Sequence, residues 1–194
     1  RGLGERGVDR RLVAERPHVA AVAGRFVVHL RRSALQRVDA IHRRGQHPIV
    51  DVDQFCADCR EALAEDQPRL AVRELLDRAL ADPRAVSDAL PPSEGRPNVL
   101  YHAPDLTVMH VVWAPGMNLY PHDHLMWAAI GIYGGQEDNA FYRRSGPGKR
   151  FLDETGGRRL VTGDVLLLGD DTIHAVTNPL GRLTGAIHVY GGDF

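Results

Sequence analysis

Gly116-Met-Asn-Leu-Tyr-Pro-His-Asp-His124 is the most informative stretch of this chain. A later stretch, His174-Ala-Val-Thr-Asn178, supplies a third histidine. Side chains alternate between the two faces of a β-strand, so His122 and His124 are predicted to share one face. Two neighbouring imidazoles chelate a divalent transition metal, and His174, which lies among β-branched residues, is the natural third ligand. The sequence therefore predicts a metal site with three histidine ligands, His122, His124 and His174.

The spacing of these residues resembles the two signature motifs of the cupin superfamily. Gly116 and the histidine pair match the first motif, and the second is matched by Gly163, His174 and Asn178. The resemblance implies a mainly β fold, a cupin double-stranded β-helix barrel of the jelly-roll type that holds a metal in its interior. N-terminal α-helices are then expected to pack outside the barrel.

One departure from the cupin pattern bears on the chemistry. Most cupins supply a glutamate three or four residues after the second histidine, where this chain has Ala128 and Ala129. Three neutral imidazoles leave a bound divalent ion with a formal charge of about +2, which favours an anionic ligand. Within the cupins, three histidines are typical of the thiol dioxygenases, in which a substrate thiolate ligates ferrous iron beside O2.

A second resemblance lies near the C-terminus. Ala186-Ile-His-Val-Tyr190 is similar to the Ser-x-His-x-Tyr strand that follows the third ligand in cysteine dioxygenases. Three earlier stretches, Asp105–Val108, Trp113–Met117 and Trp127–Asn139, resemble a bacterial group of predicted metal-dependent double-stranded β-helix enzymes that is grouped with the cysteine dioxygenases. The resemblance to cysteine dioxygenases implies catalytic roles for His188 and Tyr190, with Ala186 in place of the serine. The cysteine that crosslinks to the tyrosine in mammalian enzymes corresponds to about Ala129, so no crosslink is expected.

Candidate substrate-binding residues are less clearly marked. The resemblance places Arg96 at the position of the carboxylate-binding arginine, although His102 competes for that role. Arg143 is a candidate anion partner because one residue of its Arg-Arg pair must point inward in a regular strand. Trp127 is expected to shape the pocket or fill the core. Glu137 is predicted to orient a ligand imidazole from behind.

Composition limits the classes of function. The chain has 194 residues, of which 43% are hydrophobic and 25% charged, as in an ordinary globular domain. Its net charge of −1 argues against nucleic acid or an anionic membrane as partner. No apolar run approaches the ~18 residues of a membrane span, and no secretory signal is present, which favours a cytoplasmic protein. Cys56 and Cys59 fall on the apolar side of a predicted helix, which favours packing over redox or zinc chemistry.

Three segments are predicted along the chain. Residues 1–48 form an arginine-rich extension expected to be poorly ordered, with a transit peptide as the alternative. Residues 49–92 are helical, with starts at Asp51 or Asp53, at Pro68 and at Pro83. Residues 93–194 form the barrel, with strands near 98–102, 106–113, 125–133, 138–144, 158–161, 164–168, 173–178 and 184–190.

The leading functional hypothesis is an iron(II)-dependent enzyme that adds O2 to a small thiol substrate to give a sulfinic acid. Tyr190 then donates a hydrogen bond to oxygen or substrate and is oriented by His188. One alternative is a cupin isomerase, lyase or hydrolase that uses Zn, Mn or Ni as a Lewis acid. Another is a non-enzymatic cupin that binds a small ligand and releases it unchanged.

Overall fold

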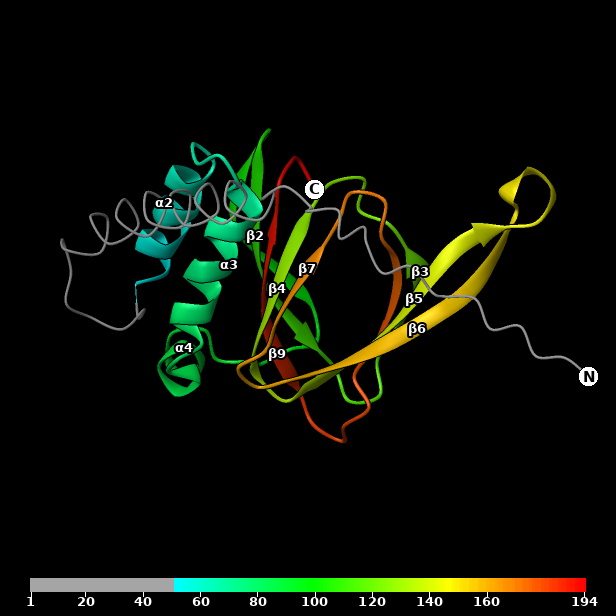
Figure 1. Cartoon of the computed structure of the whole chain (residues 1–194). Helices are drawn as coiled ribbons and strands as arrows, with labels where there is room; N and C mark the ends of the chain where they lie inside the picture. The colour runs from blue at the N-terminus through cyan, green and yellow to red at the C-terminus, as the bar shows by residue number, and fades with distance from the viewer. Residues whose placement is uncertain (1–50) are drawn as a thin grey trace, which may run out of the picture. The chain divides into compact units, whose positions relative to one another are not determined.

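The computed structural model describes residues 51–194, so the predicted extension at 1–48 lies outside the described residues. Within them, three α-helices precede nine strands, and the helices stand on one side of the barrel (Figure 1). The helices are α2 (Val52–Ala62), α3 (Pro68–Ala79) and α4 (Pro83–Ala89). They fall within the range predicted to be helical, and the strands fall within the range predicted for the barrel.

The helix starts follow from capping residues that the sequence marks. The Asp51 carboxylate accepts a hydrogen bond from the Gln54 amide at 3.0 Å, so Asp51 is the cap of α2. Asp82 caps α4 in the same way through the Ala85 amide, at 3.1 Å. Proline occupies the first turn of both α3 and α4, where its missing N–H leaves no hydrogen bond unmade.

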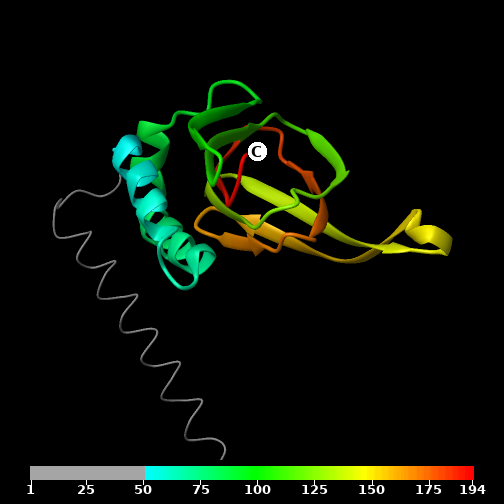
Figure 2. The same cartoon turned by 90° about the horizontal axis from the view of Figure 1, so that it is seen from above.

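The strands form two antiparallel sheets that enclose the barrel interior, as seen end-on in Figure 2. One sheet has the order β1-β2-β9-β4-β7 and the other β3-β8-β5-β6. This arrangement is the mainly β, cupin double-stranded β-helix that the motifs predict. The strands are β1 (Pro97–Ala103), β2 (Leu106–Trp113), β3 (Asn118–His122), β4 (Ala128–Gly134), β5 (Gln136–Ser145), β6 (Phe151–Val161), β7 (Val165–Leu168), β8 (Ile173–Thr177) and β9 (Thr184–Tyr190).

Two apolar clusters hold the fold together. The outer cluster joins the helices to the outer face of the five-stranded sheet and includes Leu76 and Val189. The inner cluster fills the barrel and includes Ile130 and Leu160. Successive residues of β4 belong to different clusters, as period-two alternation requires. The helices therefore pack outside the barrel, as predicted.

Cys56 and Cys59 are buried in the outer cluster, which confirms that they pack in the core. Burial, with a smaller contribution from Asp53, raises the pKa of Cys56 to about 11, and burial also raises that of Cys59. Both side chains are therefore protonated thiols near neutral pH.

The observed strands differ from the predicted ones in two places. The predicted ranges omit β3 and give β6 only its last residues. Every residue of β6 except Leu160 is exposed, so the strand has little apolar periodicity to reveal it. Much of β6 pairs with β5 in a hairpin that projects from the barrel (Figures 1 and 2).

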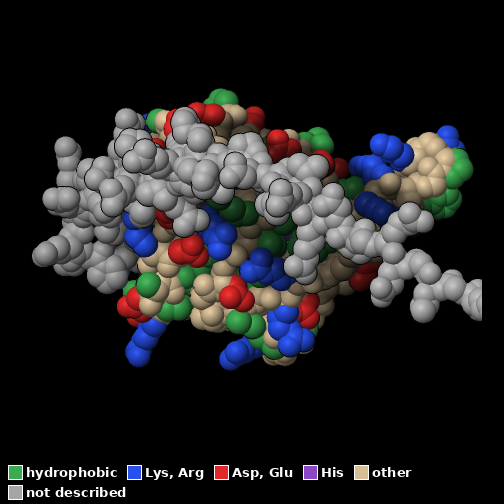
Figure 3. All heavy atoms as spheres, in the orientation of Figure 1, with side chains coloured by type: hydrophobic (Ala, Val, Ile, Leu, Met, Phe, Trp, Pro, Cys, Tyr) green, Lys and Arg blue, Asp and Glu red, His purple; other side chains and the backbone are tan. Residues whose placement is uncertain are grey.

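The tip of this hairpin is basic. A short 3-10 helix, η1 (Pro147–Lys149), turns the chain between β5 and β6. Lys and Arg side chains gather on the hairpin in the space-filling view (Figure 3), and those near its tip are exposed: Arg143, Arg144, Lys149 and Arg150. Among residues 51–194, no helix combines the length and apolar character needed to cross a membrane.

Candidate metal centre

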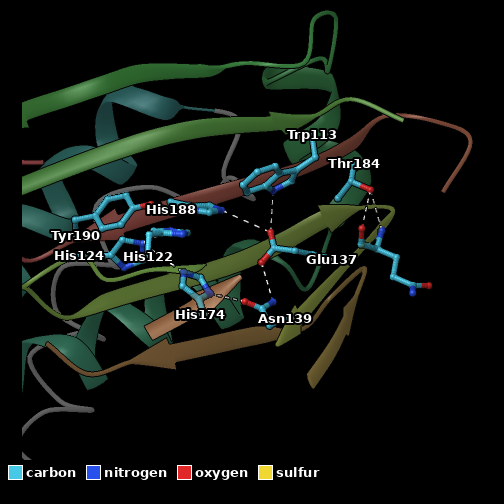
Figure 4. Close-up of polar contacts among 10 residues, drawn as sticks. Trp113, His122, His124, Glu137, Asn139, His174, Thr184, His188 and Tyr190 are labelled. Carbon is cyan, nitrogen blue, oxygen red and sulfur yellow. Dashed lines mark hydrogen bonds and ion pairs between the residues drawn. The ribbon is translucent and has the colours of Figure 1, made fainter. Parts of the chain in front are cut away.

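The three predicted ligand histidines come together inside the barrel (Figure 4). His122 ends β3 and stands opposite His174 of β8 in the strand register, while His124 follows two residues later. The Nε2 atom of His124 lies 3.1 Å from that of His122 and 3.4 Å from that of His174. His124 and His174 are buried, and His122 is partly buried. The sequence prediction of a three-histidine cluster is thus met by the geometry.

The local reason for this convergence differs from the prediction. The pair was expected to share one face of a single strand, but β3 ends at His122 and His124 lies in the following loop. The pairing of β3 with β8 shifts between Leu119 and His122, next to Pro121, which has no N–H to donate to the sheet. Leu125 follows with a φ of 57°, a left-handed conformation that turns the loop sharply.

The donor atoms fit a divalent transition metal. Bonds of about 2.1 Å to imidazole nitrogens place those nitrogens about 3.0 Å apart at right angles and about 3.4 Å apart in a tetrahedron. The two observed separations, 3.1 and 3.4 Å, match this range. Among the described residues, the group that could hold a metal consists of these three histidines and includes no carboxylate.

Hydrogen bonds fix the orientation of two of the rings. Nδ1–H of His122 donates to the backbone carbonyl of Tyr120 at 2.9 Å, and Nδ1–H of His174 donates to Oδ1 of Asn139 at 2.7 Å. Because Nδ1 carries the proton in both rings, each Nε2 keeps a free lone pair that points into the cluster. These are the tautomers that a metal ligand requires.

The electrostatic surroundings also favour neutral imidazoles. Burial, followed by the neighbouring His122 and His188, lowers the pKa of His124 to about 4. Burial and the charges of His122, His124 and His188 lower the pKa of His174 to about 3. Both rings are therefore unprotonated at neutral pH, so metal binding to these two displaces no proton.

A network of buried polar groups lies behind the cluster, on the side away from the loop of His124 (Figure 4). Glu137 of β5 is fully buried, and its carboxylate accepts hydrogen bonds from Trp113 Nε1 at 2.8 Å and Asn139 Nδ2 at 3.0 Å. Asn139 in turn accepts the bond from His174. Glu137 thus reaches a ligand imidazole through Asn139, a residue that the sequence prediction does not single out.

His188 and Tyr190 point from β9 into the same interior. His188 Nδ1 and the Tyr190 hydroxyl are 2.9 Å apart, and the Tyr190 ring meets the edge of His124 at a centroid distance of 5.0 Å. Burial and the charge of Glu137 raise the pKa of Tyr190, so its hydroxyl remains protonated. These contacts are those expected of a hydroxyl oriented by His188 beside the metal ligands.

Ala186 precedes His188 by two residues, belongs to the inner cluster and has no hydroxyl to offer. The other ring nitrogen of His188, Nε2, faces the Glu137 carboxylate at 3.8 Å instead. It is buried and has no hydrogen-bond partner among the described residues. Glu137 is therefore the polar group that faces Nε2 of His188.

The candidate substrate-binding residues are not brought to the cluster. Arg96 is exposed and pairs with Glu94 at 3.3 Å, and Arg143 is exposed on the projecting hairpin, 3.8 Å from Asp153. His102, the rival of Arg96, is also exposed and pairs with a carboxylate outside the cluster.

Trp127 packs against the outer cluster, on the helix side of the sheet. This position agrees with the predicted role in the core, whereas a role of Trp127 in shaping the pocket stays a prediction. Alternation along the chain instead turns Met126 and Ala128 toward the inner cluster. Met126 is the residue of this stretch that faces the barrel interior.

Phe194 is a site residue that sequence reasoning missed. Its ring stacks on Tyr190 at a centroid distance of 4.2 Å and meets the edge of His124 at 5.6 Å. The segment after β9 follows this path because Gly191 donates a backbone hydrogen bond to Trp127, and Phe194 donates one to the Thr107 hydroxyl. No sequence pattern signals such long-range contacts.

Comparisons with known proteins give only weak likenesses. No protein-family model matches the chain. Among solved structures, it is similar to KdgF from Halomonas sp., with 21% identity, a TM-score of 0.40, and coverage of 50% of this chain and 80% of that one. It is also similar to an RmlC-like cupin with a double-stranded β-helix fold from Methanocaldococcus jannaschii, with 11% identity, a TM-score of 0.42, and coverage of 52% of this chain and 84% of that one. For a cupin superfamily protein from Desulfitobacterium hafniense, the identity is 15%, the TM-score is 0.43, and the coverage is 56% of this chain and 88% of that one.

These likenesses concern the fold alone and carry no information on the reaction. The assignment to the cupin fold rests on the strand order of the two antiparallel sheets and on the position of the histidines between them. The class defined by the described residues is a cupin-type barrel with three histidines that could hold a metal ion.

Proposed function

We propose that this protein is an iron(II)-dependent, thiol-dioxygenase-like enzyme that adds O2 to a small, cysteine-like thiol. The S–H bond breaks, both oxygen atoms bond to sulfur, and the proton ends on the sulfinic acid product. Sulfur loses four electrons and O2 gains four, so the reaction balances without another reductant. The observation that carries the proposal is Tyr190, hydrogen-bonded to His188 and in contact with His124 in a cluster of histidines.

The ligand set supports an anionic substrate. His122, His124 and His174 are neutral donors, so they leave the positive charge of a bound ion uncompensated in the immediate cluster. Ferrous iron in this position would supply the affinity for thiolate and the reactivity toward O2. The chain's contribution is to hold the Nε2 atoms of His122 and His174 in place through the hydrogen bonds of their Nδ1 atoms.

Tyr190 supplies a hydrogen-bonding group beside the ligands. Its hydroxyl is buried, and its one hydrogen bond within residues 51–194 is to His188. A phenol hydroxyl has one donor and two acceptor positions, so it can turn from His188 to donate to a sulfur or oxygen atom of the substrate. The stacked Phe194 ring holds the Tyr190 ring in place and limits access of water from that side.

The proposal is tested by oxygen uptake with anaerobically iron-loaded protein and a series of thiols: cysteine, cysteamine, 3-mercaptopropionate and larger compounds. Uptake with one thiol, matched mole for mole by its sulfinate and abolished in His174→Ala, is the expected result. No uptake with any thiol at full iron occupancy would overturn the proposal.

Two surface variants serve as matched controls. Arg96→Gln and Arg143→Gln remove exposed guanidinium groups that pair with Glu94 and Asp153. Neither group contacts the cluster, so both variants are expected to keep the KM and kcat of the wild type. A large rise in KM for a carboxylate-bearing thiol in either variant would show that the arginine reaches the substrate.

A further inference from the structure

Glu137 is a carboxylate in an unusual place for a residue that is not a metal ligand. Its side chain has no exposure to solvent, and no Lys or Arg pairs with it among the described residues. A buried charge is costly unless hydrogen bonds or a compensating positive charge stabilise it. The Trp113 and Asn139 side chains supply two hydrogen bonds, and His188 supplies a third polar neighbour.

The first branch of the network runs from Glu137 to the metal ligand His174. The amide group of Asn139 donates from Nδ2 to Glu137, and this direction turns its Oδ1 toward His174. Because Oδ1 only accepts, Nδ1 of His174 must carry the proton and Nε2 must carry the lone pair. Glu137 therefore sets the tautomer of a ligand that it does not touch.

The second branch runs from Glu137 to Tyr190. Nε2 of His188 faces the carboxylate at 3.8 Å, and Nδ1 lies 2.9 Å from the Tyr190 hydroxyl. A carboxylate favours N–H on the ring nitrogen that faces it, so the proton of His188 belongs on Nε2. Nδ1 is then the acceptor that holds the hydroxyl of Tyr190. Ala186 has no hydroxyl, so it cannot fix the proton of His188 in place of Glu137.

We propose that Glu137 is a positioning residue that fixes the tautomers of His174 and His188 together, through Asn139 in one direction and by facing Nε2 in the other. One carboxylate thereby prepares a metal ligand and the hydrogen-bonding partner of Tyr190. The branch from Glu137 to His174 does not depend on which reaction the protein performs. The catalytic importance of the branch from Glu137 to Tyr190 rests on the proposed function.

The test begins with the metal-free protein and with 15N-labelled histidine, because long-range 1H–15N spectra report which ring nitrogen carries the proton. The wild type is expected to show the Nδ1–H form of His174 and the Nε2–H form of His188. In Glu137→Gln, an NH2 group that donates hydrogen bonds replaces one carboxylate oxygen that accepts them. At least one of the His174 and His188 rings is therefore expected to change tautomer. Zn(II) affinity, measured by competition with a chelator, is expected to fall 10- to 100-fold.

A second variant separates the two branches. Asn139→Leu removes the acceptor of His174 but leaves Glu137 beside His188, so zinc affinity is expected to fall while the tautomer of His188 stays as in the wild type. The matched control is Asp138→Asn, which alters the neighbouring carboxylate of β5, where it bonds to Gln136 and pairs with Arg159. This control is expected to keep both tautomers and the zinc affinity.

Circular dichroism and thermal unfolding establish that each variant is folded, and Asn139→Leu carries the test if Glu137→Gln does not fold. Folded variants with unchanged tautomers and zinc affinities within about threefold of wild type would overturn the inference. None of these measurements involves a thiol or O2, so failure here is distinguishable from failure of the proposed reaction.

Discussion

Acidification of the metal-free protein is expected to destabilise it as the pH falls from 6.5 to about 5. An ordinary histidine has a pKa of 6.5, whereas those of His124 and His174 lie at about 4 and about 3 in the fold. Between these values the unfolded chain binds protons that the folded chain does not bind. The free energy of unfolding therefore falls with falling pH and is greatest above pH 6.5.

The magnitude follows from the pKa values. Between pH 6.5 and pH 5, protonation of one histidine in the unfolded state alone shifts the free energy of unfolding by roughly 1.6 kcal/mol. The two ligand histidines together account for roughly 3 kcal/mol, a large part of the stability of an ordinary domain. His110, whose pKa burial also lowers, acts in the same direction.

Urea unfolding at several pH values, with a chelator present, measures this effect. His174→Gln removes one of the titrating groups, so its pH dependence is expected to be smaller than that of the wild type by roughly 1.6 kcal/mol over the interval. Excess Zn(II) binds the neutral imidazoles of the folded wild type and is expected to raise its stability. A wild-type stability that stays flat or rises on acidification, or a His174→Gln variant with an unchanged pH dependence, would refute the reasoning.

Three further substitutions have definite expected outcomes. Tyr190→Phe is expected to lower thiol-dependent oxygen uptake by about 10- to 100-fold, with zinc affinity kept within about threefold; an unchanged rate would remove Tyr190 from the reaction. Ile130→Ala in the inner cluster is expected to cost about 2–5 kcal/mol in denaturant unfolding, because it leaves a cavity among fully buried side chains. Leu125→Gly is expected to add about 0.5–1 kcal/mol of stability, because it relieves the φ of 57° on a side chain that is 79% exposed; a loss of similar size would contradict the assigned strain.

The barrel could be predicted because the spacing of the glycines and histidines resembles the cupin motifs, and the strands could be predicted because short apolar runs alternate with turn signals. In β4 and β9 the period of two separates residues that face the helices from residues that face the interior. The start of α2 was equally legible, because Asp51 caps the helix through Gln54, only three positions away. β6 was the poorest prediction, because an exposed strand paired with β5 alone needs no apolar pattern.

The cluster of three histidines could also be predicted from the sequence, since their spacing resembles a known motif. The residues around them were harder to identify, because they act through contacts between distant segments. Phe194 stacks on Tyr190 because of hydrogen bonds to Thr107 and Trp127, and Asn139 turns toward His174 because Glu137 holds its amide. For Trp127 the sequence left two roles open, and its contact with the outer cluster, which no local pattern reveals, favours packing in the core.

Metal binding by the three histidines is the central claim, and X-ray absorption spectroscopy of the iron(II)-loaded protein tests it most directly. The account predicts one ion per chain with three imidazole nitrogens at about 2.1 Å, and loss of that signature and of tight binding in His174→Ala. An ion that binds His174→Ala as tightly as the wild type, or a spectrum without imidazole scattering, would contradict the account.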